Sequence, residues 1–267
     1  MHKRVLVTGG ASGLGKALAI RWAKQGSDIC IADIHQQRAE ETVAELKAMN
    51  VDAYFIHCDI TKEEDIEQVK QSLIDKWQGV DLVVNNAGIA TADSLEDEDM
   101  EQWQLIINVN LFGAVKVTRA FAPLMKKQGK GYFLNVASQA GITPAPMMAS
   151  YNVSKAAMVS FSETMRLELH DDNIGVSALC PGFFKTNLKE SLRTKSENLK
   201  IVLDKVMERA TVTADDVANY TFKAVEANEF MIVTHKEGRT MYRLKRWLPK
   251  FYLKKMIQHT VRFRGRN

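Results

Sequence analysis

The sequence predicts an α/β domain built on one doubly wound parallel sheet of about seven strands, followed by a basic helical extension. Short apolar runs alternate with helix-length segments through most of the chain, and a Gly-rich turn joins the first run to the first helix. Parallel strands are buried on both faces and therefore read as continuous apolar runs. Because neither an internal repeat nor a low-complexity linker interrupts the pattern, we expect one domain at 1–238 and an extension at 239–267.

The expected strands are short and rich in apolar or β-branched residues: Arg4–Thr8, Asp28–Asp33, Ala53–Cys58, Asp81–Asn85, Gly131–Val136, Gly175–Cys180 and Phe230–Thr234. The expected helices lie between them: Gly13–Gln25, Gln36–Met49, Lys62–Trp77, Asp97–Lys127 and Tyr151–Leu169. Gly26 is a stop signal for the first helix. Thr61 and Glu64 have the spacing of a capping box at the start of the third.

Composition excludes several classes of protein. Of the 267 residues, 46% are hydrophobic and 25% are charged, which argues against disorder, collagen-like repeats and a disulfide scaffold. Cys30, Cys58 and Cys180 lie in apolar runs without a C-x-x-C motif, so we expect a reducing, cytoplasmic setting and no metal site. The first apolar run is too short for a signal peptide, and the uncharged stretch 131–154 holds too many polar groups to span a membrane.

The turn after the first strand reads Thr8-Gly9-Gly10-Ala11-Ser12-Gly13-Leu14-Gly15. Glycine at positions 9, 13 and 15 permits a tight turn and a close approach of the backbone to phosphate. The helix start at Gly13 presents unpaired N–H groups and a positive dipole end. Loops are often Gly-rich, but the position between a strand and a helix predicts a dinucleotide site of the Rossmann type.

Asp33 ends the second predicted strand. A carboxylate there can accept hydrogen bonds from both ribose hydroxyls and would repel a 2′-phosphate. Neither Ser12 nor Ile34 is basic, so we expect NAD in preference to NADP, although Arg38 keeps NADP open. The structural alternative is that Asp33 caps the helix beginning near Gln36.

Further motifs follow in order: Asn85-Asn86-Ala87-Gly88, Ser138, Tyr151-x-x-x-Lys155 and Pro181-Gly182. With the Gly-rich turn, they resemble the short-chain dehydrogenase/reductase family over roughly residues 3 to 233. The Tyr-x-x-x-Lys pair alone is weak, because about 0.5 such pairs are expected by chance. The resemblance implies an oxidoreductase that interconverts an alcohol and a carbonyl, working as a homo-dimer or homo-tetramer.

The resemblance also implies a catalytic tetrad of Asn110, Ser138, Tyr151 and Lys155. Tyr151 and Lys155 stand at i and i+4 on one helix face, where the ammonium is expected to lower the pKa of the phenol. Tyr151 would then be the general acid or base, Ser138 a donor to the substrate oxygen, and Asn110, rather than Asn108, the holder of a relay water. No Gly-x-Ser-x-Gly elbow surrounds Ser138, which excludes a serine hydrolase. The structural alternative is that Tyr151 and Lys155 are ordinary surface residues of this helix.

Asp59 resembles the family's adenine contact, Lys155 its nicotinamide-ribose contact and Thr186 its carboxamide contact. The full cofactor set that the resemblance implies is Gly9, Ser12, Gly13, Leu14, Gly15, Asp33, Asp59, Ile60, Asn86, Ala87, Gly88, Tyr151, Lys155, Pro181, Gly182 and Thr186.

Two apolar segments indicate a hydrophobic, lipid-like substrate. One is Pro144-Ala145-Pro146-Met147-Met148-Ala149, and the other, which the family uses as a lid, carries Phe183, Phe184, Leu188, Leu192, Leu199, Val202, Leu203 and Val206. These residues could equally pack the lid on the body. The rival functions are an NADPH-dependent reductase of long-chain fatty aldehyde or acyl-coenzyme A, and a non-catalytic dinucleotide sensor or nucleic-acid-binding module.

The last 29 residues differ from the rest in charge. They carry ten basic residues and no acid, whereas residues 1–238 carry 26 basic and 32 acidic residues, a net charge of −6. Leu253, Met256, Ile257, Thr260 and Val261 repeat at helical spacing after Pro249. The extension could pack on the body or a second subunit, dock peripherally on a membrane surface, or bind nucleic acid. We expect no nucleic-acid partner, because no groove-reading or stacking module is present.

Overall fold

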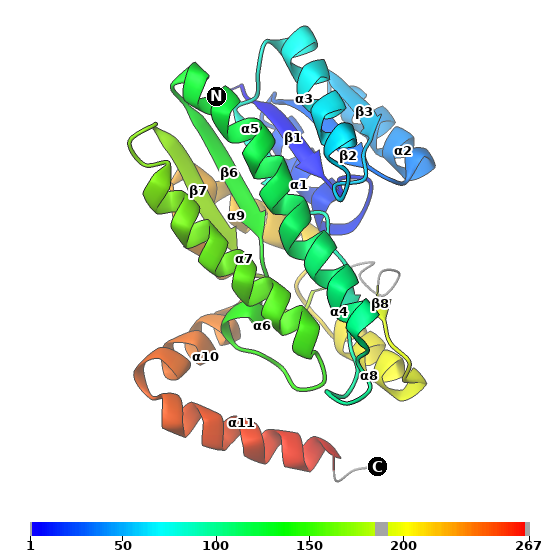
Figure 1. Ribbon diagram of the computed structural model, residues 1–267, viewed down its shortest axis with the longest axis vertical. Coiled ribbons are helices and arrows are strands. Elements are labelled where there is room, and N and C mark those ends of the chain that lie inside the picture. Colours follow the sequence, from blue (N-terminus) through cyan, green and yellow to red (C-terminus); the bar gives the residue numbers. More distant parts are fainter. Residues whose placement is uncertain (1, 185–191, 265–267) are drawn as a thin grey trace.

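The computed structural model describes residues 2–184 and 192–264 and contains a parallel sheet with helices on both faces (Figure 1). Its strands run in the order β3-β2-β1-β4-β6-β7-β9. They are β1 (Arg4–Thr8), β2 (Asp28–Asp33), β3 (Ala53–His57), β4 (Leu82–Asn85), β6 (Gly131–Val136), β7 (Ile174–Leu179) and β9 (Met231–Ile232). A small parallel pair joins β5 (Ala90–Thr91) to β8 (Leu192–Arg193).

The helices before the C-terminal extension are α1 (Gly13–Ala23), α2 (Gln36–Lys47), α3 (Glu63–Trp77), α4 (Met100–Ile107), α5 (Ala114–Gln128), α6 (Gln139–Ile142), α7 (Ala149–Glu168), α8 (Glu197–Glu208) and α9 (Ala214–Glu226). The chain continues into α10 (Lys236–Trp247) and α11 (Pro249–Arg264). The predicted doubly wound sheet is confirmed. A helix begins at Pro249 as expected, while α10 crosses the expected boundary between residues 238 and 239.

The core explains why the strands read as continuous apolar runs. Alternate residues of one strand enter different clusters: Val5 and Val7 pack with Trp22 of α1 on one face, while Leu6 packs with Phe121 of α5 on the other. All five side chains are at most 1% exposed. Burying a large apolar side chain contributes roughly 1.5–3 kcal/mol, so each strand stabilises both helical layers.

Two local predictions were wrong. Thr61 does not cap α3: Lys62 occupies the cap position, and the Thr61 hydroxyl donates instead to the Asp59 carboxylate over 2.7 Å. The expected helix Asp97–Lys127 is also not uniform, because a π-helical segment, η1 (Asn108–Gly113), separates α4 from α5. A π segment contains one extra residue per turn, which hydrophobic periodicity does not reveal.

The continuous run α4–η1–α5 (Met100–Gln128) is long and apolar enough to cross a membrane by length and composition alone. Phe121 and Met125 of this run are fully buried against the sheet. Those contacts are typical of a core helix.

Candidate active site

The Gly-rich turn is built without room for side chains. Gly9 and Gly13 have φ values of 64° and 53°, a region that other residues rarely adopt. A Cβ at position 15 would lie 2.1 Å from the Gly9 carbonyl oxygen. Ser12, the residue before α1, makes no side-chain cap, and Leu14 is buried in the core. The glycine backbone and the first N–H groups of α1 can therefore approach a diphosphate closely. This arrangement fits the diphosphate of a dinucleotide.

Asn86 and Thr8 lock this turn to the neighbouring strand. The Asn86 amide donates to the carbonyl oxygens of Thr8 and Gly9 at 3.0 and 2.9 Å. The Thr8 hydroxyl accepts from the N–H groups of Asn86 and Ala87 at 3.0 and 3.2 Å. Asn86 therefore fixes the Gly-rich turn against the segment that follows β4. The buried hydroxyl of Thr8 helps to hold this contact, a role that the sequence analysis missed.

Asp33 lies at the end of β2, and its carboxylate is fixed by backbone. It accepts from the N–H of Ala11 at 2.9 Å and from that of His35 at 3.0 Å. His35, not Asp33, occupies the cap position of α2. The charge is therefore held beside the Gly-rich turn.

Asp59 and Ile60 lie beyond β3. The Asp59 carboxylate accepts from both the N–H and the hydroxyl of Thr61, at 2.9 and 2.7 Å. The Ile60 side chain is in the core, where a Cβ on Gly113 would lie 2.4 Å from its Cδ1. Only backbone atoms of Ile60 can therefore face a cofactor.

Three of the four predicted catalytic residues meet beyond the end of β6. Tyr151 and Lys155 are both buried on α7, and Lys155 Nζ lies 5.9 Å from the centre of the Tyr151 ring. Lys155 Nζ donates to the Val136 carbonyl over 2.9 Å. Ser138 caps α6 by accepting from the Ala140 N–H at 3.1 Å, and its hydroxyl acts to lower the pKa of Tyr151.

Burial changes the acidity of this group. It raises the pKa of Tyr151, while the Ser138 side chain opposes that change only in part. It lowers the pKa of Lys155 to about 8. Burial therefore moves the pKa of the Tyr151 phenol in the direction opposite to the one expected from a neighbouring ammonium. The phenol is held in its protonated form near neutral pH.

Asn110 lies in η1, and its amide is occupied by backbone. Its Oδ1 accepts from the Ile89 N–H at 2.8 Å, and its Nδ2 donates to the Ile89 carbonyl at 2.9 Å and to Ser154 Oγ at 3.1 Å. A Cβ on Gly88 would lie 3.0 Å from Asn110 Oδ1 and 3.6 Å from Lys155 Nζ. Asn110 thus fixes the chain after Gly88 beside Lys155.

Glu98 is a positioning residue that the sequence did not reveal. Its buried carboxylate accepts from the Ser150 N–H at 3.0 Å and from the Ser150 hydroxyl at 2.5 Å. Ser150 precedes Tyr151 in the first turn of α7, where a carboxylate is favoured by the helix dipole. The two residues are 52 positions apart, so no local pattern signals this contact.

The loop after β7 is held by α6 and by the start of α10. The Pro181 carbonyl accepts from the Gln139 N–H at 2.8 Å. The Gly182 N–H donates to His235 Nδ1 at 3.0 Å, and His235 Nε2 lies 3.0 Å from the Phe183 carbonyl oxygen. Both contacts require a neutral ring protonated on Nε2, and burial lowers the pKa of His235 accordingly. Thr186 and Leu188 lie outside the described residues.

The surroundings of Tyr151 are apolar. Ala90, Ile106 and Met148 form a buried cluster with it, and Leu192 and Leu203 pack against that cluster. These contacts include both segments that the sequence predicted to line a substrate site.

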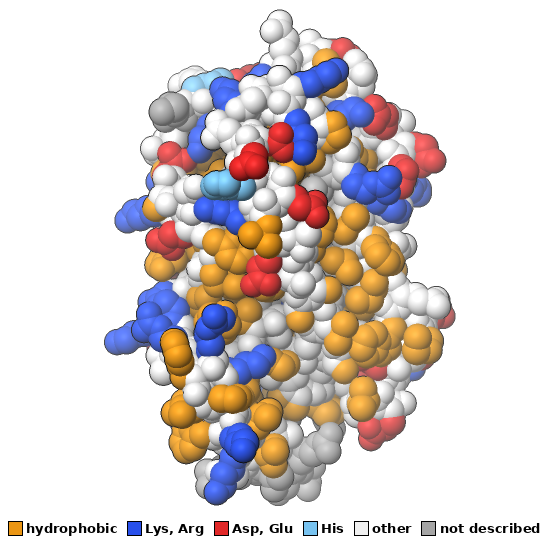
Figure 2. Space-filling view, turned by 60° about the vertical axis from the view of Figure 1, so that its left-hand side comes forward, with side chains coloured by type: hydrophobic (Ala, Val, Ile, Leu, Met, Phe, Trp, Pro, Cys, Tyr) orange, Lys and Arg blue, Asp and Glu red, His pale blue; other side chains and the backbone are white. Residues whose placement is uncertain are grey.

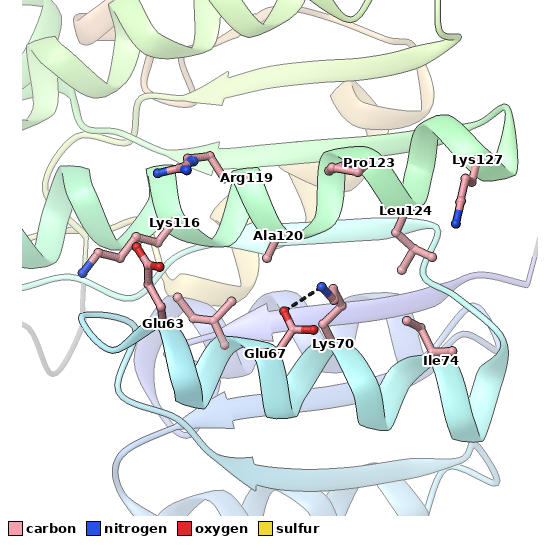
Figure 3. A pocket seen from close by; sticks show the side chains of 11 residues that line it. Glu63, Glu67, Lys70, Ile74, Lys116, Arg119, Ala120, Pro123, Leu124 and Lys127 are labelled. Carbon is pink, nitrogen blue, oxygen red and sulfur yellow. Dashed lines mark ion pairs between the residues drawn. The ribbon is translucent and has the colours of Figure 1, made fainter.

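A groove between α3 and α5 lies elsewhere on the molecule (Figure 3). Its walls include Ile66, Lys116 and Leu124, and a Glu67–Lys70 ion pair of 2.6 Å lies within it. None of the predicted catalytic or cofactor-binding residues lines this groove. It is a surface feature of two helices rather than part of the site.

Residues 3–197 match the family model described as short chain dehydrogenase. The chain belongs to the short-chain dehydrogenase/reductase family. As a member, it is an oxidoreductase that acts on CH–OH groups with NAD or NADP.

Similar proteins of this family have related activities. The 3-oxoacyl-[acyl-carrier-protein] reductase FabG of Thermotoga maritima is 36% identical over 73% of this chain and 79% of its own. A short-chain dehydrogenase/reductase from Burkholderia phymatum, solved with NAD, has a TM-score of 0.87 at 28% identity and covers 92% of this chain and 93% of its own. A 3-ketoacyl-(acyl-carrier-protein) reductase from Brucella melitensis, solved with NADH, has a TM-score of 0.76 at 29% identity, covering 86% of this chain and 96% of its own.

Proposed function

We propose that the protein is an NAD-dependent oxidoreductase that interconverts an alcohol and a carbonyl on a hydrophobic substrate. The observation that carries this proposal is the meeting of Tyr151, Ser138 and Lys155 beyond β6, within an apolar cluster. A substrate oxygen beside Tyr151 would be surrounded by hydrogen-bond donors, while its carbon chain would meet Met148 and Leu203. That combination suits a carbonyl or alcohol with a large apolar portion.

The state of Tyr151 determines its role. A phenol is protonated near neutral pH, and burial raises the pKa of Tyr151 further, so Tyr151 can give its proton to a carbonyl oxygen as general acid. Ser138 donates a hydrogen bond to the same oxygen as negative charge develops, and the Lys155 ammonium stabilises the phenolate left behind. A bound nicotinamide dinucleotide supplies the hydride donor or acceptor. Oxidation requires Tyr151 to take up the proton.

The preference for NAD rests on Asp33. The N–H groups of Ala11 and His35 hold its carboxylate at the edge of the Gly-rich turn. A fixed negative charge there favours ribose hydroxyls and disfavours a 2′-phosphate. The relatives solved with NAD and NADH support the same preference.

Acyl-carrier-protein reductases among the relatives favour a second candidate. In it, the protein reduces a carbonyl carried on a long acyl thioester. The catalytic residues would be the same, so the two candidates differ in substrate and are separated by one panel of compounds.

The decisive experiment measures turnover of long-chain alcohols, aldehydes and 3-oxoacyl thioesters in the parent chain and in Tyr151→Phe. We expect Tyr151→Phe to lower kcat by roughly 10²–10⁴-fold, because the general acid is lost. Tyr220→Phe, which loses a hydroxyl at an exposed position of α9, is the matched control and should retain full turnover. Persistent turnover in Tyr151→Phe would refute the proposed proton donor.

The cofactor preference is tested by comparing kcat/KM for NADH and NADPH. We expect NADH to be preferred, and Asp33→Asn to shift the ratio toward NADPH by roughly tenfold as charge repulsion is removed. Asp171→Asn removes an exposed carboxylate elsewhere and should leave the ratio unchanged. An NADPH preference in the parent chain would contradict the role of Asp33.

A further inference from the structure

The helices α10 and α11 carry an exposed surface of mixed apolar and basic side chains. Its apolar members are Trp247, Leu248, Phe251, Leu253 and Ile257, which are 56–77% exposed. Its basic members are the exposed Arg243, Arg246, Lys250, Lys254 and Lys255. We call these ten residues the tail surface. In the part of the chain that the structure describes, they include five of the fifteen exposed large hydrophobic side chains.

The tail surface belongs to an anchored element. Tyr242 of α10 packs against the core cluster that contains Ile142, and Lys245 Nζ donates to the Ile142 carbonyl at 2.7 Å. Arg239 donates to the carbonyl oxygens of Val233 and Thr234. One face of α10 therefore packs on the body, as one interpretation of the extension expected.

The second helix is placed differently. α11 packs mainly on α10, and Tyr252, 2% exposed, is its buried residue among those whose side chains are described. Phe251, Leu253 and Ile257 on the same helix remain open to solvent. Several large apolar side chains left exposed on one short segment are typical of a contact surface in a soluble protein.

Charge defines what could cover this surface. Residues 239–267 contain ten basic residues and no acid. Within the described residues, none of the five cations of the tail surface forms an ion pair. At the lower left of Figure 2, orange and blue side chains mix at the end of the molecule that carries α10 and α11. The surface is complementary to a partner that is both apolar and negatively charged.

Two other partners fit less well. A second copy that paired symmetrically through the tail surface would place cations against cations, because a two-fold interface is self-complementary. A nucleic acid would neutralise the cations, but it offers no apolar volume for Phe251, Leu253 and Ile257. An anionic bilayer satisfies both requirements, because its headgroups meet lysine and arginine while its acyl boundary accepts leucine, phenylalanine and tryptophan.

We propose that the tail surface docks peripherally on an anionic phospholipid membrane. The helices lie in the plane of the interface, with Trp247 and Phe251 at headgroup depth and Leu253 and Ile257 in the acyl boundary. In Figure 1, α11 lies at the same end of the molecule as α6 and α8, which border the apolar cluster around Tyr151. Docking therefore brings the substrate-lining segments toward the lipid surface.

The test is co-sedimentation of the full chain with vesicles, without any substrate. We expect binding to vesicles of phosphatidylcholine mixed with phosphatidylserine, no binding to pure phosphatidylcholine, and weaker binding as salt screens the charges. The triple variant K250E/K254E/K255E should bind more than 100-fold less tightly, at roughly fivefold for each cation removed. F251S/I257S should also lose binding, since insertion needs apolar area.

Leu167→Ser is the matched control, because Leu167 is 79% exposed on α7, away from the tail surface. It should bind vesicles like the parent chain, and circular dichroism should show all variants folded. The proposal is overturned if the parent chain does not bind anionic vesicles, or if both tail variants bind as the parent does. It is equally overturned if the tail variants abolish self-association while vesicle binding persists.

Discussion

The cofactor end of the sheet and the C-terminal helices use polar side chains in opposite ways. Around the Gly-rich turn, Asn86, Asp33 and Asn110 each bond to backbone N–H or C=O groups and hold one geometry. On α11, Lys250 and Lys254 point into solvent and hold nothing in place. Single substitutions should therefore be severe in the first region, whereas only summed charge and apolar area should matter in the second.

The largest effect is expected at Gly15. A Cβ there would lie 2.1 Å from the Gly9 carbonyl oxygen and 2.5 Å from the Asn86 amide nitrogen. Gly15→Val should destabilise the fold by about 1–3 kcal/mol and abolish dinucleotide binding, because the turn must open. Thermal unfolding and NADH titration measure the two effects.

Gly26 provides the contrast to Gly15. It follows α1, whereas Gly15 lies in the first turn of that helix, and a Cβ at position 26 would meet nothing within 4 Å. Its φ of 76° is one that asparagine tolerates. Gly26→Asn should bind NADH like the parent chain. If both variants lost NADH binding equally, the close packing of the Gly-rich turn would not be the cause of the loss.

The next effect concerns pH. Lys155 has a pKa of about 8, so its charge is lost as pH rises through that value, while burial raises the pKa of Tyr151 and keeps the phenol protonated. The kcat for carbonyl reduction should therefore fall above about pH 8, measured with substrate and NADH saturating. Lys155→Arg keeps its charge, so its slower turnover should not show this decline. If Lys155→Arg showed the same decline, the decline would have to come from the titration of another group.

A smaller effect is expected at His235, which connects the two regions. Removing its Nδ1 acceptor by His235→Ala leaves the Gly182 N–H without its partner and should raise KM for NADH roughly three- to tenfold. His235→Asn, whose Oδ1 can replace Nδ1, should recover part of this loss. Steady-state kinetics with full substrate saturation measure both.

The same residue predicts a pH dependence of stability. Because burial lowers the folded-state pKa of His235 below 6.5, the unfolded chain binds the proton more readily. Its contribution to stability is therefore present above about pH 6.5 and is lost as pH falls through the lower folded value. His235→Asn should show less acid destabilisation than the parent in urea titrations at pH 5 and pH 7.

Most of the fold could be predicted because local pattern and global structure agree. The bounds of β1, β2 and β6 match the expected ones, since each is an apolar run that is buried on both faces. β9 is shorter than expected, because only Met231 and Ile232 pair with β7. Strand ends depend on such pairing, which a single segment does not encode.

For the candidate site, the sequence indicated residues but not their partners. Thr8, Glu98 and His235 act on residues far along the chain, so no spacing rule identifies them. The rise in the pKa of Tyr151 has the same origin, since its burial depends on the completed core. Motifs predict which chemical groups are present, whereas their acidity and support arise from tertiary contacts.

The orientation of Asn110 depends on the number of residues in the π-helical segment η1. Removing one residue from Asn108–Gly113 would restore a regular helix and rotate everything on one side of the cut by about 100°. The Asn110 carboxamide would then turn away from Ile89, even though every motif residue would be retained. A homologue with a one-residue deletion in this segment should therefore need a different support for its chain after Gly88.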